Sequence, residues 1–350
     1  MNELLCSACF QDKGLRLDAQ RLGRDGDTPC PNCGATSGKR LDREQLGWLA
    51  GRFFVHGTLH RPRYGGYPAL QFNEHRYPET EVQFPQWLQR DAALITETLK
   101  IGIFHYGPRF WMFGEIEPLK ALLRRRTRPR IIERILTEFP VKPLLPADVF
   151  YRLRIGPKEA ADPREYDSPR AELRLSGRLN SAGHPVIYGS QDLEVCVHEC
   201  RATVEDLTYV AAMSPTRNLR LLDLTKLLKE DGTEFESLDL TIQMLFLAGK
   251  HSYRICREIA LAARGAGFHG LVYPSYFTLA RTGGMPFPTV YGISVRRFPS
   301  QTEAIQALTI PNLALFGRPI EDGTVSLRSI NRLQLNRVDY DILFGPAAYS

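Results

Sequence analysis

The chain has 350 residues, of which 43% are hydrophobic and 24% are charged. This composition supplies enough apolar material for one large or two medium globular domains. No apolar run approaches the roughly 20 residues that cross a bilayer. The N-terminal sequence MNELLCSACF lacks the basic start and the long apolar segment of a secretory signal. We therefore expect a cytoplasmic protein with no membrane partner.

The formal net charge is +6, and much of it lies in the run 124–130, which reads RRRTRPR. Such a run can bind nucleic acid, although a solvated surface is its more usual explanation. The seven cysteines form two CxxC pairs and three single residues. This pattern favours metal binding in a reducing compartment over a disulfide framework.

Residues 1–40 contain both CxxC pairs, Cys6 with Cys9 and Cys30 with Cys33, each in a turn-like sequence. Two thiolates in one tight turn bind one side of a tetrahedral ion, and a second such turn completes the coordination. The sequence therefore predicts a small zinc ribbon or knuckle with a structural ion. A redox-active CxxC is disfavoured because the motif is doubled and no thioredoxin-like context surrounds it.

Residues 41–146 are predicted to form a mostly helical domain. Residues 85–99 and 124–139 both have apolar positions at helical spacing. Pro140, Pro143 and Pro146 follow the second helix and predict a stiff connector. We place a domain boundary there, which leaves residues 147–350 as a third domain.

Residues 147–350 combine helical and alternating patterns and predict an α+β domain. The strand DVFYRLRI carries Arg152 and Arg154 on one face, which is unusual unless that face meets an anion. The stretch 177–201 then contains Arg178, a short strand ending near Tyr188, and a helix that carries Glu199. A carboxylate half-shielded by apolar neighbours and facing such a strand is a candidate catalytic group. The alternative is an ordinary solvated helix.

Two later pieces complete the pattern. The buried strand GLVYP is followed by Ser275, and the strand NLALF includes Asn312. Active-site hydroxyls commonly lie at strand ends, although a serine there is more often a turn residue.

Taken in order, FYRLR, GRLNSAGHPVIY, the helix with Glu199, GLVYPS and NLALF resemble the RES domain, a family named for its Arg, Glu and Ser. The matching pieces span most of residues 147–316 and correspond to Arg152, Tyr188, Glu199 and Ser275. The N-terminal part, including GIFHYGPRFWMFGEIEPL, resembles the extension ahead of some RES domains that is classed with HEPN-like modules. It lacks the Arg-x4-6-His motif of HEPN ribonucleases.

The resemblance implies an ADP-ribosyltransferase-like fold and an enzyme that degrades NAD at the nicotinamide–ribose bond, by hydrolysis or phosphorolysis. It also implies an intracellular toxin or effector with a neighbouring antitoxin. Glu199 would stabilise the cationic ribose, and Tyr188 would stack on the substrate. Arg152 and Arg178 would hold the pyrophosphate. Ser275 and Asn312 would line the site.

Two alternatives remain open: transfer of ADP-ribose to a protein or nucleic acid, and a zinc-knuckle adaptor that binds a partner without turning over NAD. The sequence also departs from the family pattern. Leu179 follows Arg178 where the family commonly has Trp, and Cys196, Val197 and His198 replace small residues before Glu199. The family arginine is assigned to Arg152, with Arg154 as the alternative.

Overall fold

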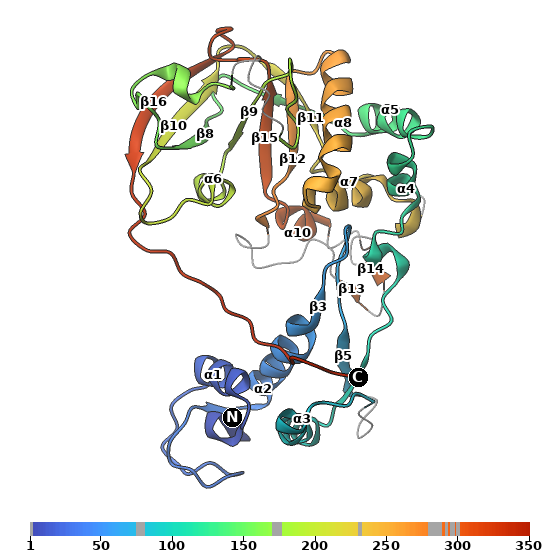
Figure 1. Ribbon diagram of the computed structural model, residues 1–350, viewed down its shortest axis with the longest axis vertical. Coiled ribbons are helices and arrows are strands. Elements are labelled where there is room, and N and C mark those ends of the chain that lie inside the picture. The colour runs from blue at the N-terminus through green and yellow to red at the C-terminus, as the bar shows by residue number, and fades with distance from the viewer. Residues whose placement is uncertain are drawn as a thin grey trace. The chain divides into compact units, whose positions relative to one another are not determined.

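The computed structural model describes residues 3–74, 81–169, 177–229, 233–278, 289–290, 293–294, 298 and 302–350. The chain divides into two compact units (Figure 1). Unit 1 comprises Met1–Pro62, Gly66–Pro108 and Tyr340–Ser350, and unit 2 comprises Arg63–Gly65 and Arg109–Asp339. Each helix within the described residues is too short or too polar to cross a lipid bilayer.

Unit 1 is built from three α-helices and short paired strands. The α-helices are α1 (Lys13–Leu22), α2 (Arg43–Ala50) and α3 (Gln86–Leu99). The strands pair as β1 (Leu5–Cys6) with β2 (Arg40–Leu41), β3 (Leu59–His60) with β4 (Tyr67–Pro68), and β5 (Leu70–Asn73) with β6 (Gly102–His105). Short helical turns are η1 (Ser7–Cys9), η2 (Gly51–Val55) and η3 (His56–Thr58).

The helices of unit 1 begin where the sequence supplies a cap. Asp42 accepts a hydrogen bond from the Gln45 main-chain NH and so satisfies a free donor at the start of α2. Helix α3 confirms the helix predicted over residues 85–99, and its apolar side buries Leu88, Ile95 and Leu99. These side chains join one core with residues of α1, α2, β5 and β6.

The C-terminal segment 340–350 packs in unit 1, although the sequence assigned it to the RES domain. Arg52 pairs with Asp341 at 2.6 Å. The main chains of Gln83 and Ser350 exchange hydrogen bonds of 2.7 and 3.1 Å. Phe344 packs among the partly buried side chains at the edge of the unit 1 core.

Unit 2 holds the large sheet and most of the helices. Its helices are α4 (Glu117–Leu123), α5 (Arg128–Glu138), α6 (Leu193–Cys200), α7 (Leu238–Leu247), α8 (Tyr253–Gly265) and α10 (Thr302–Ala307), with turns η5 (Phe110–Phe113), η6 (Pro163–Tyr166), η7 (Glu234–Glu236) and η8 (Lys250–Ser252). Its strands are β7 (Val141–Leu144), β8 (Phe150–Ile155), β9 (Val186–Ser190), β10 (Thr208–Pro215), β11 (Leu219–Asp223), β12 (Gly270–Pro274), β13 (Thr289–Val290), β14 (Ile293–Ser294), β15 (Pro311–Phe316) and β16 (Val325–Leu333).

The described strands of the large sheet run in the order β16-β10-β8-β9-β15-β12-β11-β7. Strands β11 and β12 are parallel, and the other neighbours are antiparallel. Strands β9 and β12 are both antiparallel to β15. They therefore end at the same edge of the sheet, where β15 begins. The α+β prediction is confirmed.

Two cores lie on the two faces of this sheet. One packs Leu271 and Ala314 under α4, α5, α7 and α8, and Figure 1 shows α8 beside β11 and β12 with α4 and α5 outside it. The other core joins Phe150 and Met213 of the β8–β10 half to Leu313 of the other half. This second core therefore includes residues from both halves of the sheet.

One part of the sequence analysis needs correction. Residues 140–146 were expected to be a connector, but β7 lies at the edge of the large sheet and pairs with β11. Proline is tolerated on such an edge because one side of the strand needs no ladder hydrogen bond. The LRLLD segment forms strand β11, the partner of β7. The compact units also divide near residue 108 because α4 and α5 share the core of α7 and α8. The three-domain assignment itself stays a prediction.

The basic run 124–130 includes one buried arginine among exposed ones. The Arg128 guanidinium donates to the carbonyl oxygens of Leu122 and Leu123 at 2.6 and 3.2 Å. It also pairs with Glu258 of α8 at 2.6 Å. Arg128 therefore ties the α4–α5 corner to α8, while Arg124, Arg125 and Arg126 remain exposed.

Replacing Arg128 tests this role. We expect Arg128→Ala to lower the free energy of unfolding by about 2–4 kcal/mol, because buried carbonyls and a half-buried carboxylate lose their donor. Arg126→Ala, in the same run but exposed, should change it by less than about 0.5 kcal/mol. Denaturant unfolding measures both, and equal effects of the two variants would contradict the assignment.

Candidate active site

Strands β8 and β9 separate after a single pair, and helix α6 packs where they part. The described pairing between them is Tyr151 with Ser190 alone. In place of further pairing with β9, two carbonyl oxygens of β8 accept hydrogen bonds from α6. The Tyr151 carbonyl accepts from the Cys196 thiol at 3.4 Å, and the Leu153 carbonyl accepts from the Cys200 thiol at 3.6 Å. Helix α6 thus uses main-chain acceptors that β9 does not reach. This packing fixes the position of Glu199 in its last turn.

Glu199 is held by two neutral donors from different strands. The Ser275 hydroxyl donates to Glu199 Oε1 at 2.9 Å, and the Asn312 side-chain NH2 donates to the same oxygen at 2.5 Å. Ser275 is 0% exposed and Asn312 is 2% exposed, whereas Glu199 lies in the exposed class. The structure therefore brings together three of the predicted site residues around one solvent-accessible carboxylate.

Sheet register explains why these residues meet. Asn312 pairs with Tyr273 of β12 on one side and with Ser190 of β9 on the other. Ser275 directly follows β12. The two donors therefore come from the edge where β9 and β12 end and β15 begins. In Figure 1, α6 and α10 lie at this end of the strands.

Tyr188 positions the loop that carries Arg178. Its hydroxyl accepts a hydrogen bond from the Leu179 main-chain NH at 2.9 Å and donates to Asn180 Oδ1 at 2.8 Å. Burial raises the pKa of Tyr188 to about 12, so the hydroxyl keeps its proton. The observed contacts use the Tyr188 hydroxyl, which orders residues 179 and 180. Stacking of the Tyr188 ring on the substrate would use the face of the ring and stays a prediction.

Arg178 is fixed by the junction of α7 and α8. Its guanidinium donates to the Ala248 carbonyl at 3.2 Å and lies 4.8 Å from the centre of the Tyr253 ring. The charges of both Arg178 and Glu199 influence the buried Tyr273. The pKa of the Tyr273 hydroxyl is raised well above its usual value. Burial is the largest cause, followed by the negative charge of Glu199. Among the described residues, no hydrogen bond or ion pair joins Arg178 to Glu199.

Arg152 crosses the gap between β8 and β9. It donates to the carbonyl oxygens of Tyr188 at 2.9 Å and of Asp167 at 3.3 Å. Burial, followed by the positive charge of Arg154, lowers the pKa of Arg152 to about 10. The guanidinium thus stays charged at neutral pH. Among the described residues, its hydrogen bonds go to main chain and not to Glu199.

These residues fall within a recognisable family region, since residues 149–284 match the RES domain family model. The chain carries a RES domain. The match includes Arg152, Arg178, Tyr188, Glu199 and Ser275, while Asn312 lies beyond its end. No curated protein matches the chain.

A similar chain occurs in the crystal structure of the M. tuberculosis MbcT–MbcA toxin–antitoxin complex. The two chains are 15% identical, and the similarity covers 58% of this chain and 91% of that one, with a TM-score of 0.33. The RES assignment therefore rests on the family match. The relation of the N-terminal part to HEPN-like modules stays a prediction.

Sequence reasoning missed three residues that shape the RES site. Tyr273 lies two positions before Ser275, and alternation along GLVYPS was a signal that both face the same side. Asn180 anchors the Tyr188 hydroxyl, and Tyr253 lies under Arg178. Neither of these two has a motif of its own, because each acts through a contact that only the folded chain creates.

The cysteines of the RES domain are structural. Burial raises the pKa of Cys196 to about 12 and that of Cys256 to about 11. Both therefore carry protonated thiols at neutral pH and are poor nucleophiles. His198, next to Glu199, points to a different neighbour and stacks on Phe277 with ring centres 5.7 Å apart.

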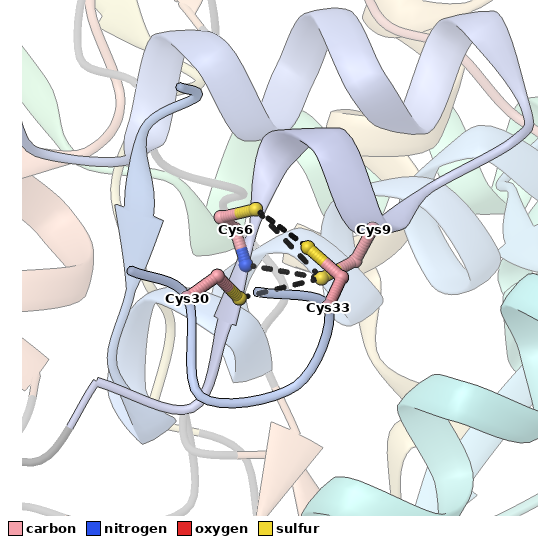
Figure 2. Close-up of side chains that lie close together, drawn as sticks. All are labelled: Cys6, Cys9, Cys30 and Cys33. Atoms are coloured by element: carbon pink, nitrogen blue, oxygen red, sulfur yellow. Dashed lines mark hydrogen bonds between the residues drawn. The ribbon is translucent and has the colours of Figure 1, made fainter. Parts of the chain in front are cut away.

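The predicted metal ligands form a cluster in unit 1. Cys6, Cys9, Cys30 and Cys33 place their sulfur atoms within 4.8 Å of one another (Figure 2). The Sγ–Sγ distances are 3.8 Å for Cys6–Cys9, 3.6 Å for Cys6–Cys33 and 3.6 Å for Cys9–Cys30. Sulfur atoms on a tetrahedron with bonds of roughly 2.3 Å lie about 3.8 Å apart. The four side chains therefore fit one tetrahedral ion.

Donors around the cluster favour thiolates. The Cys6 main-chain NH and the Asn32 side chain each donate to Cys9 Sγ at 3.4 Å. Arg40, which is almost fully buried, orders the second cysteine loop by donating to main-chain carbonyls. The acceptors are the carbonyl oxygens of Thr28, Ala35, Ser37 and Gly38, at 2.6, 3.1, 3.4 and 2.8 Å. The structure thus supports a closed metal site with an ordered surrounding shell.

Replacing the Tyr188 hydroxyl tests its positioning role. We expect Tyr188→Phe to speed hydrogen exchange at the Leu179 amide and to lower the free energy of unfolding by about 1–3 kcal/mol, because two buried polar groups lose their partner. Tyr276→Phe, on an exposed ring, is the matched control. Unchanged exchange at Leu179 in Tyr188→Phe would show that the loop is ordered by other contacts.

Proposed function

We propose that the RES domain cleaves the bond between nicotinamide and ribose in NAD. The observation that carries this proposal is the Glu199 carboxylate, which is oriented by Ser275 and Asn312 and open to solvent. Both donors use the same carboxylate oxygen, so within the described part of the chain the other oxygen remains available to a substrate. The family match adds a second, independent line of support.

The electrostatics of this arrangement suit an oxocarbenium-like transition state. Nicotinamide leaves as a neutral base, and positive charge develops on the ribose as the bond lengthens. A carboxylate next to that carbon stabilises the charge. Ser275 and Asn312 orient Glu199 without cancelling its charge, as an arginine or lysine partner would. In the described residues, no cation pairs with Glu199.

The remaining site residues have supporting roles in this proposal. Arg178, fixed by Ala248 and Tyr253, would present a guanidinium to the pyrophosphate. Tyr188 would keep the Arg178 loop in place through Leu179 and Asn180. Arg152 would hold β8 and β9 at the separation that admits α6, and Arg154 is the more exposed alternative for a substrate phosphate.

The biological role is proposed from the family resemblance. RES enzymes of toxin–antitoxin pairs deplete NAD, so we propose a toxin or effector that a neighbouring antitoxin restrains. Water, phosphate or a macromolecule would accept the ADP-ribose. NAD labelled in its adenylate half separates these outcomes. Free ADP-ribose indicates hydrolysis, ADP-ribose 1-phosphate indicates phosphorolysis, and label on protein or nucleic acid indicates transfer.

We propose zinc as the ion of the cysteine cluster. Four sulfur ligands at tetrahedral spacing are typical of structural Zn²⁺, with no open position for a substrate. An ion there would fix the loop around Cys30 and Cys33 to the turn around Cys6 and Cys9. Its contribution is to the folding of unit 1, because binding energy at a structural zinc site is folding energy.

The Glu199→Gln variant tests the catalytic proposal most sharply. The amide oxygen can still accept from Ser275 and Asn312, so the change removes the charge and retains the geometry. We expect nicotinamide release from NAD to fall by about 100-fold or more. Glu194→Gln, in the exposed first turn of the same helix, should keep the wild-type rate.

Two further results would count against the catalytic proposal. Wild-type release by Glu199→Gln would remove the carboxylate charge from the mechanism. Absence of NAD turnover in the folded wild-type protein, together with steeply salt-dependent nucleic-acid binding, would favour the adaptor alternative.

Metal analysis tests the zinc proposal. We expect about one zinc per purified chain, and Cys30→Ser should lose most of it and unfold at a lower temperature. Cys256→Ser, a buried thiol outside the cluster, should keep the zinc. Iron in place of zinc, or full metal content in Cys30→Ser, would refute the assignment.

A further inference from the structure

A second concave site lies in unit 2 on strands that do not contribute to the Glu199 cluster. Its volume is about 340 Å³, within the range of small-molecule pockets. Tyr209 of β10 and Leu327 and Ile330 of β16 form its partly buried apolar part. Arg328 and Arg332 also line it. We call this cavity the β10–β16 groove.

A cross-strand row places a tyrosine between two arginines. Tyr209 pairs with Arg154 of β8 on one side and with Arg332 of β16 on the other. Directly paired residues in antiparallel strands share a face, and neighbouring strands lie about 4.8 Å apart. Arg154 and Arg332 therefore lie on the same face of the sheet as Tyr209, and Arg332 lines the groove with it.

A β-bulge supplies the third arginine. Ala212 pairs with Ser329 and Met213 pairs with Leu327, so Arg328 is the extra residue between them. A bulge redirects the side chain that it carries. Arg328 is held in its new direction by hydrogen bonds to Ser214 Oγ at 2.6 Å and to the Pro146 carbonyl at 2.8 Å.

The positive charge of the groove is not neutralised by the described residues. Among those residues, Arg328 and Arg332, which line the groove, make no ion pair with a carboxylate. The nearest acidic stretch in sequence is the loop after β8, where Ala160 and Ala161 contact the groove. Its Asp162 is engaged by Arg164 at 2.8 Å, Glu159 is exposed, and Glu165 is partly buried.

We propose that the β10–β16 groove binds a phosphate-bearing small molecule of nucleotide size. Guanidinium groups recognise phosphate through paired N–H donors, and an aromatic ring beside them offers a surface for a base. The apolar part formed by Leu327 and Ile330 favours a ligand with a flat organic group over bare phosphate. The limited volume favours one nucleotide over an acidic peptide or a nucleic-acid strand.

This groove is separate from the Glu199 site. In the sheet, β8 and β9 lie between β10 and β15, which carries Asn312. Different substitutions are therefore needed to abolish binding at each of the two sites. A nucleotide bound here would contact the half of the sheet that includes β8, the strand to which α6 is fastened.

Calorimetric titration of the full chain with AMP tests the proposal. Adenosine and ribose 5-phosphate serve as probes that lack the phosphate and the base. We expect AMP to bind more tightly than either. Arg332→Ala should weaken AMP binding about tenfold or more, because a charged hydrogen-bonding partner is lost. Arg337→Ala, an exposed arginine paired with Asp339, is the matched control.

Each outcome either supports AMP binding in the β10–β16 groove or overturns it. Loss of AMP binding in Arg332→Ala, with binding retained in Arg337→Ala and Glu199→Gln, supports the groove. Loss in Glu199→Gln with full binding in Arg332→Ala assigns AMP to the RES site and overturns the proposal. No AMP binding by the folded chain also overturns it, as does Arg332-dependent binding of polyglutamate or RNA without AMP. Circular dichroism checks that every variant is folded.

Discussion

The early separation of β8 from β9 is the constraint on which the RES site depends. Two strands that stayed paired would satisfy each other's carbonyls and leave no place for α6. Pairing between the strands stops at Tyr151 and Ser190. The carbonyl oxygens of Tyr151 and Leu153 therefore accept hydrogen bonds from thiols of the helix. Arg152 spans the opening by donating to the Tyr188 carbonyl. Helix α6, which carries Glu199, is therefore positioned by main-chain carbonyls of β8 that the sheet leaves without a partner.

The groups that orient the Glu199 carboxylate are neutral, so they do not cancel its negative charge. Buried neutral groups set the direction of the carboxylate, whereas Arg178 donates to the Ala248 carbonyl and Arg152 to the Tyr188 carbonyl. A carboxylate paired with a cation would have its charge compensated before the substrate arrives. In the proposed reaction, this charge would stabilise a ribose that becomes positive, which is the property expected of preorganised electrostatic catalysis.

The sequence was sufficient for elements with a strong local signal. The doubled CxxC motif predicted the cysteine cluster, and helical spacing predicted α3 and α6. The ordered RES motifs led to the Glu199 carboxylate and its two donors. It failed for β7, because three prolines indicate a connector and only the position at a sheet edge makes them compatible with a strand. It also gave no sign of the hydrogen bonds that the Tyr188 hydroxyl makes, since these depend on Leu179 and Asn180 folding back towards it. The stacking role of the ring stays a prediction.

The return of residues 340–350 to unit 1 has a consequence for synthesis. Unit 2 is in effect inserted between Pro108 and Tyr340 of unit 1. During translation, the cysteine-bearing unit waits for its last packing partners, including Phe344 and Ser350, until the whole RES domain has left the ribosome. Unit 1 begins to emerge first, but unit 2, which carries the RES domain, can form all of its contacts before unit 1 can.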